Sequence, residues 1–125
     1  MNDDVIMIYD REGKARLMVF SDGRIVDFKG KPVGFLDSGY VYDYKGTHWG
    51  WYDMGILRDK KGECVGFTDM VTDELHPPLP QKIIRPLPSL VDIEPVRPEL
   101  KMSPPKLFKT IYWSKYNPLS LFSGE

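Results

Sequence analysis

One tetrapeptide pattern, an Asp followed by any residue, then Lys or Glu, then Gly, occurs four times in the first half of the chain. The copies begin at Asp10, Asp27, Asp43 and Asp59, and end at Gly13, Gly30, Gly46 and Gly62. The glycines are therefore 17, 16 and 16 residues apart. A repeat of this length is one supersecondary unit, and several copies must pack together to bury a core. The repeat predicts four similar units packed around one core.

Each copy has the chemistry of a β-hairpin tip. Asp at the first position of a tight turn bonds the backbone further along, and Gly at the fourth supplies a positive φ. The residue two positions before each Asp is aliphatic in every copy, and we expect it to face the core. These residues are Ile8, Ile25, Val41 and Leu57. After the turn, alternation predicts one inward face that carries Met18, Val33, Trp49, Val65, Phe20, Phe35, Trp51 and Phe67.

The opposite face of the second strand carries Gly34, Gly50 and Gly66, with Val19 at this place in the first copy. A glycine inside a strand often marks a backbone that another segment approaches closely, so we expect a cover over this face. In this alignment the stretch from Lys14 to Val19 is two residues longer than its counterparts, and the link that follows is one residue shorter.

Further turn signals lie between the units, at Asp22-Gly23, Asp37-Ser38-Gly39 and Asp53-Met54-Gly55. The sequence therefore predicts an all-β fold of four sequence-repeated antiparallel β-hairpins in a pseudo-fourfold closed arrangement, followed by an extended Pro-rich tail. The expected domains are a four-hairpin β domain at 1–72, a Pro-rich extended segment docking on it at 73–105, and an aromatic-rich C-terminal segment at 106–125.

Residues 77–105 contain nine prolines, too many for a helix or a central strand, and polyproline-like structure is expected. Aliphatic residues are interleaved with the prolines, which is unlike a disordered linker. Residues 1–76 carry 10 Lys and Arg against 14 Asp and Glu, and residues 77–125 carry 7 against 4. A basic, apolar, extended tail can thus wrap an acidic ring. The large side chains of 107–122 must dock on their own ring, on a second subunit or on a partner.

The repeats, the strand ends of the form G-[FW]-x-D, the Pro-rich stretch and the Trp113-Ser114 segment together resemble the four-fold beta-flower proteins, a bacterial family. The resemblance covers essentially the whole chain and implies a flower-like ring of four β-hairpins. It brings no assigned activity. A weaker likeness, at Tyr9-Asp10 and Tyr42-Asp43, is to the YD repeats of large secreted toxins, which normally come in long arrays.

Candidate chemistry is sparse. His48, Trp49, Trp51 and Tyr52 form the most aromatic stretch, and they could bind a sugar or a cationic group if they do not simply fill core positions. Cys64 and His48 could pair as thiolate and base, but no third group that would orient them is visible, and we expect no catalytic residue. The repeated acids sit where turns already favour Asp, and two histidines with one cysteine are too few for a zinc site, so no metal or cofactor is expected.

These observations favour a non-catalytic interaction or scaffold module, with small-ligand binding at Trp49 and Trp51 as the alternative. The expected partners are an unknown protein or a second copy, as a homodimer through the C-terminal tail. The net charge of -1 gives no reason to expect nucleic acid. No apolar segment predicts a membrane span, and the single Cys64 suits a reducing cytoplasm.

Overall fold

The computed structural model of the chain describes residues 5–83, 87–100, 105–106 and 108–123. Eight antiparallel strands pair in chain order, and the last strand pairs with the first to close the sheet. The strands are β1 (Ile6–Tyr9), β2 (Ala15–Val19), β3 (Arg24–Asp27), β4 (Pro32–Asp37), β5 (Tyr40–Tyr42), β6 (His48–Asp53), β7 (Ile56–Asp59) and β8 (Cys64–Phe67), and a short 3-10 helix, η1 (Leu121–Ser123), follows. The predicted all-β closed arrangement of four hairpins is confirmed.

The four Asp-to-Gly tetrapeptides form the tips of the hairpins β1–β2, β3–β4, β5–β6 and β7–β8. At each tip the Asp Oδ1 atom accepts hydrogen bonds from the backbone amides two and four residues later, at 2.9 to 3.0 Å. The glycine that ends each tip has φ between 84° and 90°. Local turn chemistry thus sets the position of every hairpin.

The register of the strands corrects the alignment of the first copy. Gly34, Gly50 and Gly66 pair with the aliphatic residue of the preceding strand in their own hairpins. In the first hairpin the residue in that place is Leu17, which pairs with Ile8, and the assignment of Val19 to it is wrong. The extra residue lies instead in the following link, because four residues separate Val19 from Arg24. Leu17 and Val19 share a face, so alternation cannot distinguish these two registers.

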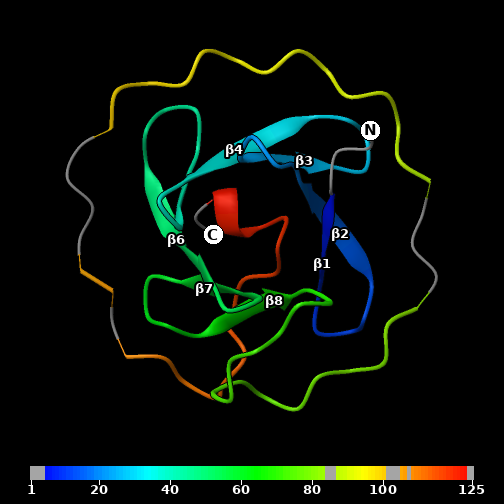
Figure 1. The fold of residues 1–125 in the computed structure, drawn as a ribbon, viewed down its shortest axis with the longest axis vertical. Helices are drawn as coiled ribbons and strands as arrows, with labels where there is room; N and C mark the ends of the chain where they lie inside the picture. The colour runs from blue at the N-terminus through cyan, green and yellow to red at the C-terminus, as the bar shows by residue number, and fades with distance from the viewer. Residues whose placement is uncertain (1–4, 84–86, 101–104, 107, 124–125) are drawn as a thin grey trace.

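The core lies on the axis of the ring. Ile8, Ile25, Val41 and Leu57, one from each hairpin, are at most 1% exposed and pack around the fully buried Leu121. Figure 1 shows the C-terminal segment inside the ring. We call residues 114–123 the plug. A Cβ on Gly34 would collide with Phe122, and one on Gly66 would press on Pro118. The predicted cover over the glycine face is therefore confirmed at these two glycines.

The second strands do not present one uniform inward face. Val33, Trp49 and Val65 pack with the central cluster. Phe35 instead stacks on Tyr42, and Phe67 on Tyr9. Each hairpin has a register shift next to its glycine pair, or next to the Ile8–Leu17 pair in the first hairpin, and such irregularities increase the local twist of a strand. The prediction of a single inward face is therefore wrong for these aromatic residues.

A long segment encircles the ring outside the hairpin tips (Figure 1). We call residues 73–110 the belt; its described residues form neither strand nor helix. Its backbone amides donate to tip carbonyls, from Ile83 to Gly13 at 3.0 Å, from Asp92 to Gly30 at 2.8 Å, and from Thr110 to Gly62 at 3.1 Å. At the third tip, Pro98 and Glu99 lie beside Gly46. The belt thus passes the four tips in chain order.

Cys64 connects the belt to the plug. Its amide donates to the Tyr112 carbonyl at 2.9 Å, and its carbonyl accepts from the Ser114 amide at 2.8 Å. These bonds form an isolated parallel bridge between Cys64 and Trp113. The chain therefore turns from the outside of the ring to its centre at the fourth hairpin.

Candidate functional site

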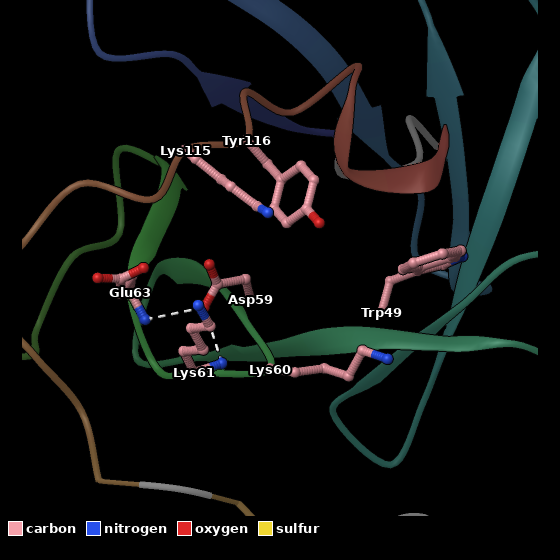
Figure 2. A pocket seen from close by; sticks show the side chains of 7 residues that line it. All are labelled: Trp49, Asp59, Lys60, Lys61, Glu63, Lys115 and Tyr116. Carbon is pink, nitrogen blue, oxygen red and sulfur yellow. Dashed lines mark hydrogen bonds between the residues drawn. The ribbon is translucent and has the colours of Figure 1, made fainter. Parts of the chain in front are cut away.

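A cavity of about 320 Å³ lies where the plug meets the fourth hairpin. We call it the Trp49 cavity. It is lined by Trp49 of β6, by Asp59, Lys60, Lys61 and Glu63 around the fourth tip, and by Lys115 and Tyr116 of the plug. Figure 2 shows side chains from the hairpins on one side of it and those of Lys115 and Tyr116 on the other. The cavity therefore depends on the docked plug.

Lysines lie beside both aromatic rings of the Trp49 cavity. The Lys60 ammonium is 5.3 Å from the centroid of the Trp49 ring, and the Lys115 ammonium is 5.1 Å from that of Tyr116. The Trp49 indole N–H donates to the Asp43 Oδ2 atom at 2.9 Å, which fixes the plane of the ring. The Trp49 ring is thus held in place, and both rings have a cation beside them.

The buried acid of the cavity is already bonded on both oxygens. Asp59 is 3% exposed, and its Oδ1 atom accepts from the amides of Lys61 and Glu63 at 2.9 and 3.0 Å. Its Oδ2 atom accepts from the Ser114 hydroxyl at 2.5 Å. Asp59 therefore serves to fix the hairpin tip and the plug, and the remaining acid of the cavity lining is Glu63.

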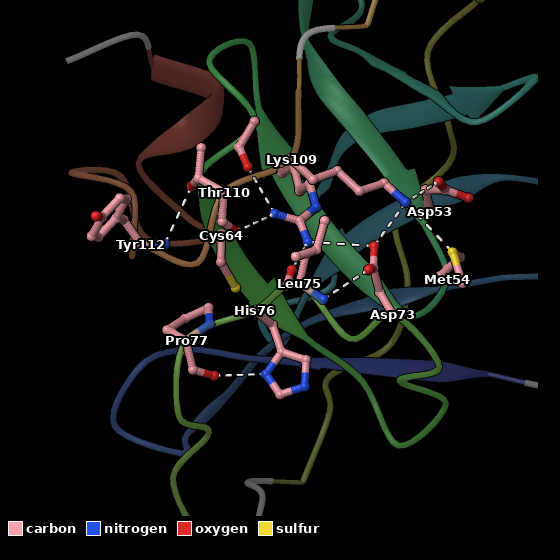
Figure 3. A network of polar contacts seen from close by, with 12 residues as sticks. Asp53, Met54, Cys64, Asp73, Leu75, His76, Pro77, Lys109, Thr110 and Tyr112 are labelled. Carbon is pink, nitrogen blue, oxygen red and sulfur yellow. Dashed lines mark hydrogen bonds and ion pairs between the residues drawn. The ribbon is translucent and has the colours of Figure 1, made fainter.

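A buried arginine, Arg58, bonds to both ends of the belt. Figure 3 shows these ends close together, with Asp73 and Leu75 from one and Lys109 and Thr110 from the other. Arg58 has no exposed surface, and its Nη1 atom donates to the carbonyls of Gly62 at 2.7 Å and Thr110 at 3.0 Å. Its Nη2 atom donates to the Leu75 carbonyl and lies 3.4 Å from an Asp73 oxygen. We call Arg58, Asp73 and Lys109 the clasp. The sequence reading did not single out Arg58, but a signal was present: the corresponding strand positions hold Tyr9, Val26 and Tyr42, so a charged residue there departs from the repeat.

The four aromatic candidates do not form one surface. Trp49 is partly buried and lines the cavity, whereas Trp51 is 1% exposed and lies in the interior. The His48 ring packs against Tyr40 and Tyr42, at centroid distances of 5.3 and 5.6 Å. Tyr52 packs against the central cluster. Among the four, the structure brings Trp49 to a cavity that could hold a ligand.

The possible nucleophile Cys64 lies in the interior. Its side chain has no exposed surface, and burial raises the pKa of the thiol to about 12, despite the nearby Arg58 charge. Burial also lowers the pKa of His48, which would otherwise be near 6.5. Within the described part of the chain, no group of three or more His, Cys, Asp or Glu is placed to hold a metal ion.

The belt carries a row of exposed aliphatic side chains that the sequence reading did not single out. Leu87, Leu90, Ile93 and Val96 are 91 to 95% exposed. We call these four residues the outer row. They follow one another at intervals of three residues, and a polyproline II helix has three residues per turn. All four side chains therefore lie on one edge of the belt and point away from the ring.

A second repeat in the sequence could have predicted how the belt is placed. The carbonyls of Gln81, Leu90, Glu99 and Phe108, nine residues apart, lie at the four tip glycines. Nine residues are three turns of polyproline II helix, so the same edge returns to each tip. The signal is visible in Pro77, Pro86, Pro95 and Pro104, which are also nine residues apart.

A search of the described residues for a helix long and apolar enough to cross a bilayer finds none.

Comparison with known proteins agrees with the fold. A family model described as 4-fold beta flower protein matches residues 6–122, which takes in the ring, the belt and nearly all of the plug. Neither the search of curated proteins nor the search of solved structures found a match. The matched span includes all four hairpins. The chain therefore belongs to the 4-fold beta flower protein family.

Proposed function

We propose that the protein is a non-catalytic interaction module that binds a partner protein through the outer row of its belt. The observation that carries this proposal is the exposure of Leu87, Leu90, Ile93 and Val96, each above 90%. Contiguous exposed apolar side chains are uncommon on monomeric proteins and mark sites of interaction.

The backbone beneath the outer row is held to the ring. The Ser89 amide donates to the Phe28 carbonyl at 3.0 Å, and the Asp92 amide donates to the Gly30 carbonyl at 2.8 Å. Arg97 adds a bond to the Asp22 carbonyl at 2.8 Å. A partner would therefore meet an ordered ridge and would not need to order the chain, which lowers the entropic cost of binding.

The state of the possible catalytic groups supports a non-catalytic role. The Cys64 thiol is buried with a raised pKa, so little of it is present as the reactive thiolate near neutral pH. The His48 ring lies between Tyr40 and Tyr42 and faces a different neighbourhood from Cys64. The state of Cys64 and His48 thus favours an interaction role over catalysis by these two residues.

A second copy of the chain is one partner that the outer row could accept. Each plug in this arrangement fills its own ring, so a homodimer would form by contact between belts and without exchange of the C-terminal segment. Another protein with an apolar groove would use the same ridge.

Site-specific photocrosslinking tests the proposal. A photoreactive phenylalanine replaces Leu90 or Ile93 in one set of cells, and exposed Lys45 or Ser38 in the matched control set. We expect a discrete adduct from positions 90 and 93, lost when Leu87 and Val96 are changed to Gln. An adduct of twice the chain mass would identify a second copy. Equal crosslinking from the control positions, or none from the outer row, would refute the interaction role.

A second candidate function is small-ligand binding, and the Trp49 cavity is the observation that favours it. The pair Trp49 and Trp51 cannot act together on a ligand, because Trp51 is 1% exposed. A cationic ligand is also disfavoured, since the Lys60 ammonium already lies over the Trp49 ring. Small-ligand binding would therefore involve Trp49 with Tyr116, and the ligand would be neutral or anionic.

A further inference from the structure

We infer that the Trp49 cavity binds a small organic anion that has a flat body, of the class of a nucleoside monophosphate. The cavity of about 320 Å³ is at the lower end of the volumes of small-molecule sites. This site is separate from the outer row, so the inference does not depend on the proposed protein partner.

The charges of the lining favour an anion. Lys60, Lys61 and Lys115 border the cavity, and within the described part of the chain none of the three forms an ion pair. Asp59 is bonded through both oxygens to the hairpin tip and to Ser114. Glu63 is the acid that remains to oppose an anion. The ammonium groups are therefore available for charge-assisted hydrogen bonds to a phosphate or carboxylate.

The rings determine the shape of the ligand body. Trp49 and Tyr116 come from different parts of the chain and line the same cavity (Figure 2). Aromatic side chains bind flat groups such as nucleobases by stacking, which adds about 1 to 3 kcal/mol per base. The Lys60 and Lys115 ammonium groups lie over these rings, so the planar body of the ligand would take the ring faces while its charged group draws the ammonium groups to itself.

Cavities of about 370 and 530 Å³ also lie at the second and third tips, but of these three cavities Lys115 and Tyr116 line only the one at the fourth tip. The chain enters the ring beside the fourth hairpin, where Cys64 pairs with Trp113, and this brings Lys115 and Tyr116 to that tip. The tip itself has Lys60 where the other tips have Arg11, Phe28 and Tyr44. The cavity at the fourth tip therefore combines Trp49 with two plug residues, Lys115 and Tyr116, that the other two cavities lack.

Calorimetric titration with three probes tests the inference: adenosine monophosphate, adenosine and inorganic phosphate. We expect the monophosphate to bind more tightly than either fragment, and more weakly as salt is raised. If phosphate alone binds as well as the monophosphate, the site recognises only the anion. If adenosine alone binds as well, it recognises only the ring. Either result overturns the inference, as does the absence of saturable binding by all three.

Charge-reversal variants locate the site. Lys115→Glu should weaken binding of the monophosphate about tenfold, as expected for losing a charge-assisted contact and adding a repulsive one. Lys106→Glu is the matched control, because Lys106 lies nine residues earlier in the chain and over the Tyr40 ring. We expect its effect to be below about twofold. Glu63→Gln should tighten binding. Equal weakening by both lysine variants would show general electrostatic attraction and refute the site.

The indole N–H signals of the three tryptophans provide an independent readout by nuclear magnetic resonance. Trp49→Phe identifies the Trp49 signal and keeps an aromatic ring in the cavity. Addition of the monophosphate should shift the Trp49 signal and leave that of the buried Trp51 in place. A shift confined to Trp51 or Trp113 would place the ligand elsewhere and contradict the inference.

Discussion

The carboxylate of Asp73 lies 2.7 Å from the ammonium of Lys109, and the two residues stand at opposite ends of the belt. Lys109 also lies 2.8 Å from an oxygen of Asp53, the last residue of β6. The described residues of the belt form no ladder of internal hydrogen bonds, so their path depends on contacts with the ring and on this closure. The ion pair turns an extended segment into a closed loop around the hairpins.

The clasp makes stability depend on pH. Burial would raise the pKa of Asp73, but the hydrogen bond from Lys109, that from the Leu75 amide and the charges of Lys109 and Arg58 outweigh burial and hold the pKa below 3.8. A carboxyl group with a lowered pKa stabilises the folded state above its unfolded pKa. This contribution is lost as the pH falls below about 4 and through the folded pKa.

Asp73→Asn therefore should lower the free energy of unfolding at pH 7 by on the order of 2 kcal/mol. The difference from the wild-type protein should narrow as the pH falls below about 4, since the wild-type carboxylate is then protonated too. Urea unfolding at a series of pH values measures both quantities. Asp37→Asn, at an exposed carboxylate that accepts from Ser38, is the control. A difference that does not change with pH would contradict the assigned role.

Arg58→Met should destabilise the protein by about 3 kcal/mol, because it leaves carbonyls of Leu75 and Thr110 without their buried donor. Arg24→Met is the matched control. Arg24 pairs with Asp22 at 2.8 Å, but on the surface, where such a pair contributes less than about 1 kcal/mol. Chemical unfolding of both variants checks the difference. Similar losses for both would mean that the clasp contributes no more than a surface pair.

Gly30→Ala tests the contact between belt and tip. A Cβ at Gly30 would overlap the carbonyl oxygen of Leu90, and the residue also has a positive φ of 90°. Gly39 has a φ of 83°, but the nearest atom to its added Cβ would be a Tyr52 oxygen at 3.4 Å, and Gly39→Ala therefore controls for backbone strain. We expect Gly30→Ala to be the more destabilising by about 1 to 3 kcal/mol, the range for overpacking.

Hydrogen exchange gives a local check of the same variants. The Asp92 amide, which donates to the Gly30 carbonyl at 2.8 Å, should exchange faster in Gly30→Ala than in Gly39→Ala. Unchanged protection of Asp92 in Gly30→Ala would mean that the belt does not depend on this contact.

Local chemistry made the ring predictable from the sequence. The tip residues Asp43 and Gly46 form their turn by interactions within five residues, so the local sequence of each copy is enough to specify its turn. The axial residue Val41 could be identified by alternation and by recurrence in every copy. Leu17 could not be aligned correctly, because Val19 is also apolar and lies on the same face.

The clasp and the Trp49 cavity depend on contacts between distant segments. Arg58 reaches Leu75 and Thr110, and the two carbonyls meet only because described parts of the belt lie at all four tips. Trp49 could be chosen as a candidate, but Lys115 and Tyr116 reach it only after the plug has entered the ring. No spacing in the sequence contains this information.

The structure of the belt could be predicted only in part from the sequence. Its extended form follows from the prolines, and its nine-residue period can be read from Pro77 and Pro95 with the prolines between and after them. Which edge faces the ring could not be predicted, because Leu90 and Ile93 would suit either a buried or an exposed edge. The ring has its own core around Leu121, and this leaves the outer row exposed.

Cys64 should react slowly with thiol reagents in the native protein, and this reactivity reports on the plug. Burial raises the pKa of its thiol to about 12, so very little of the thiol is present as the reactive thiolate at pH 8. Its backbone is also bonded on both sides to Tyr112 and Ser114. Labelling should therefore require local opening of the bridge to Trp113, and it should become fast in denaturant.

Arg58→Met should accelerate this labelling, because Arg58 holds the Thr110 carbonyl just before the chain reaches the bridge. Arg24→Met should not, since Arg24 lies on the second hairpin and pairs with Asp22 on the surface. A colorimetric thiol assay on folded protein measures the rates. Immediate labelling of the folded wild-type protein would contradict the burial of Cys64 and would make it a candidate nucleophile again. Slow labelling accelerated by Arg58→Met alone would instead place the opening step at the junction of belt and plug.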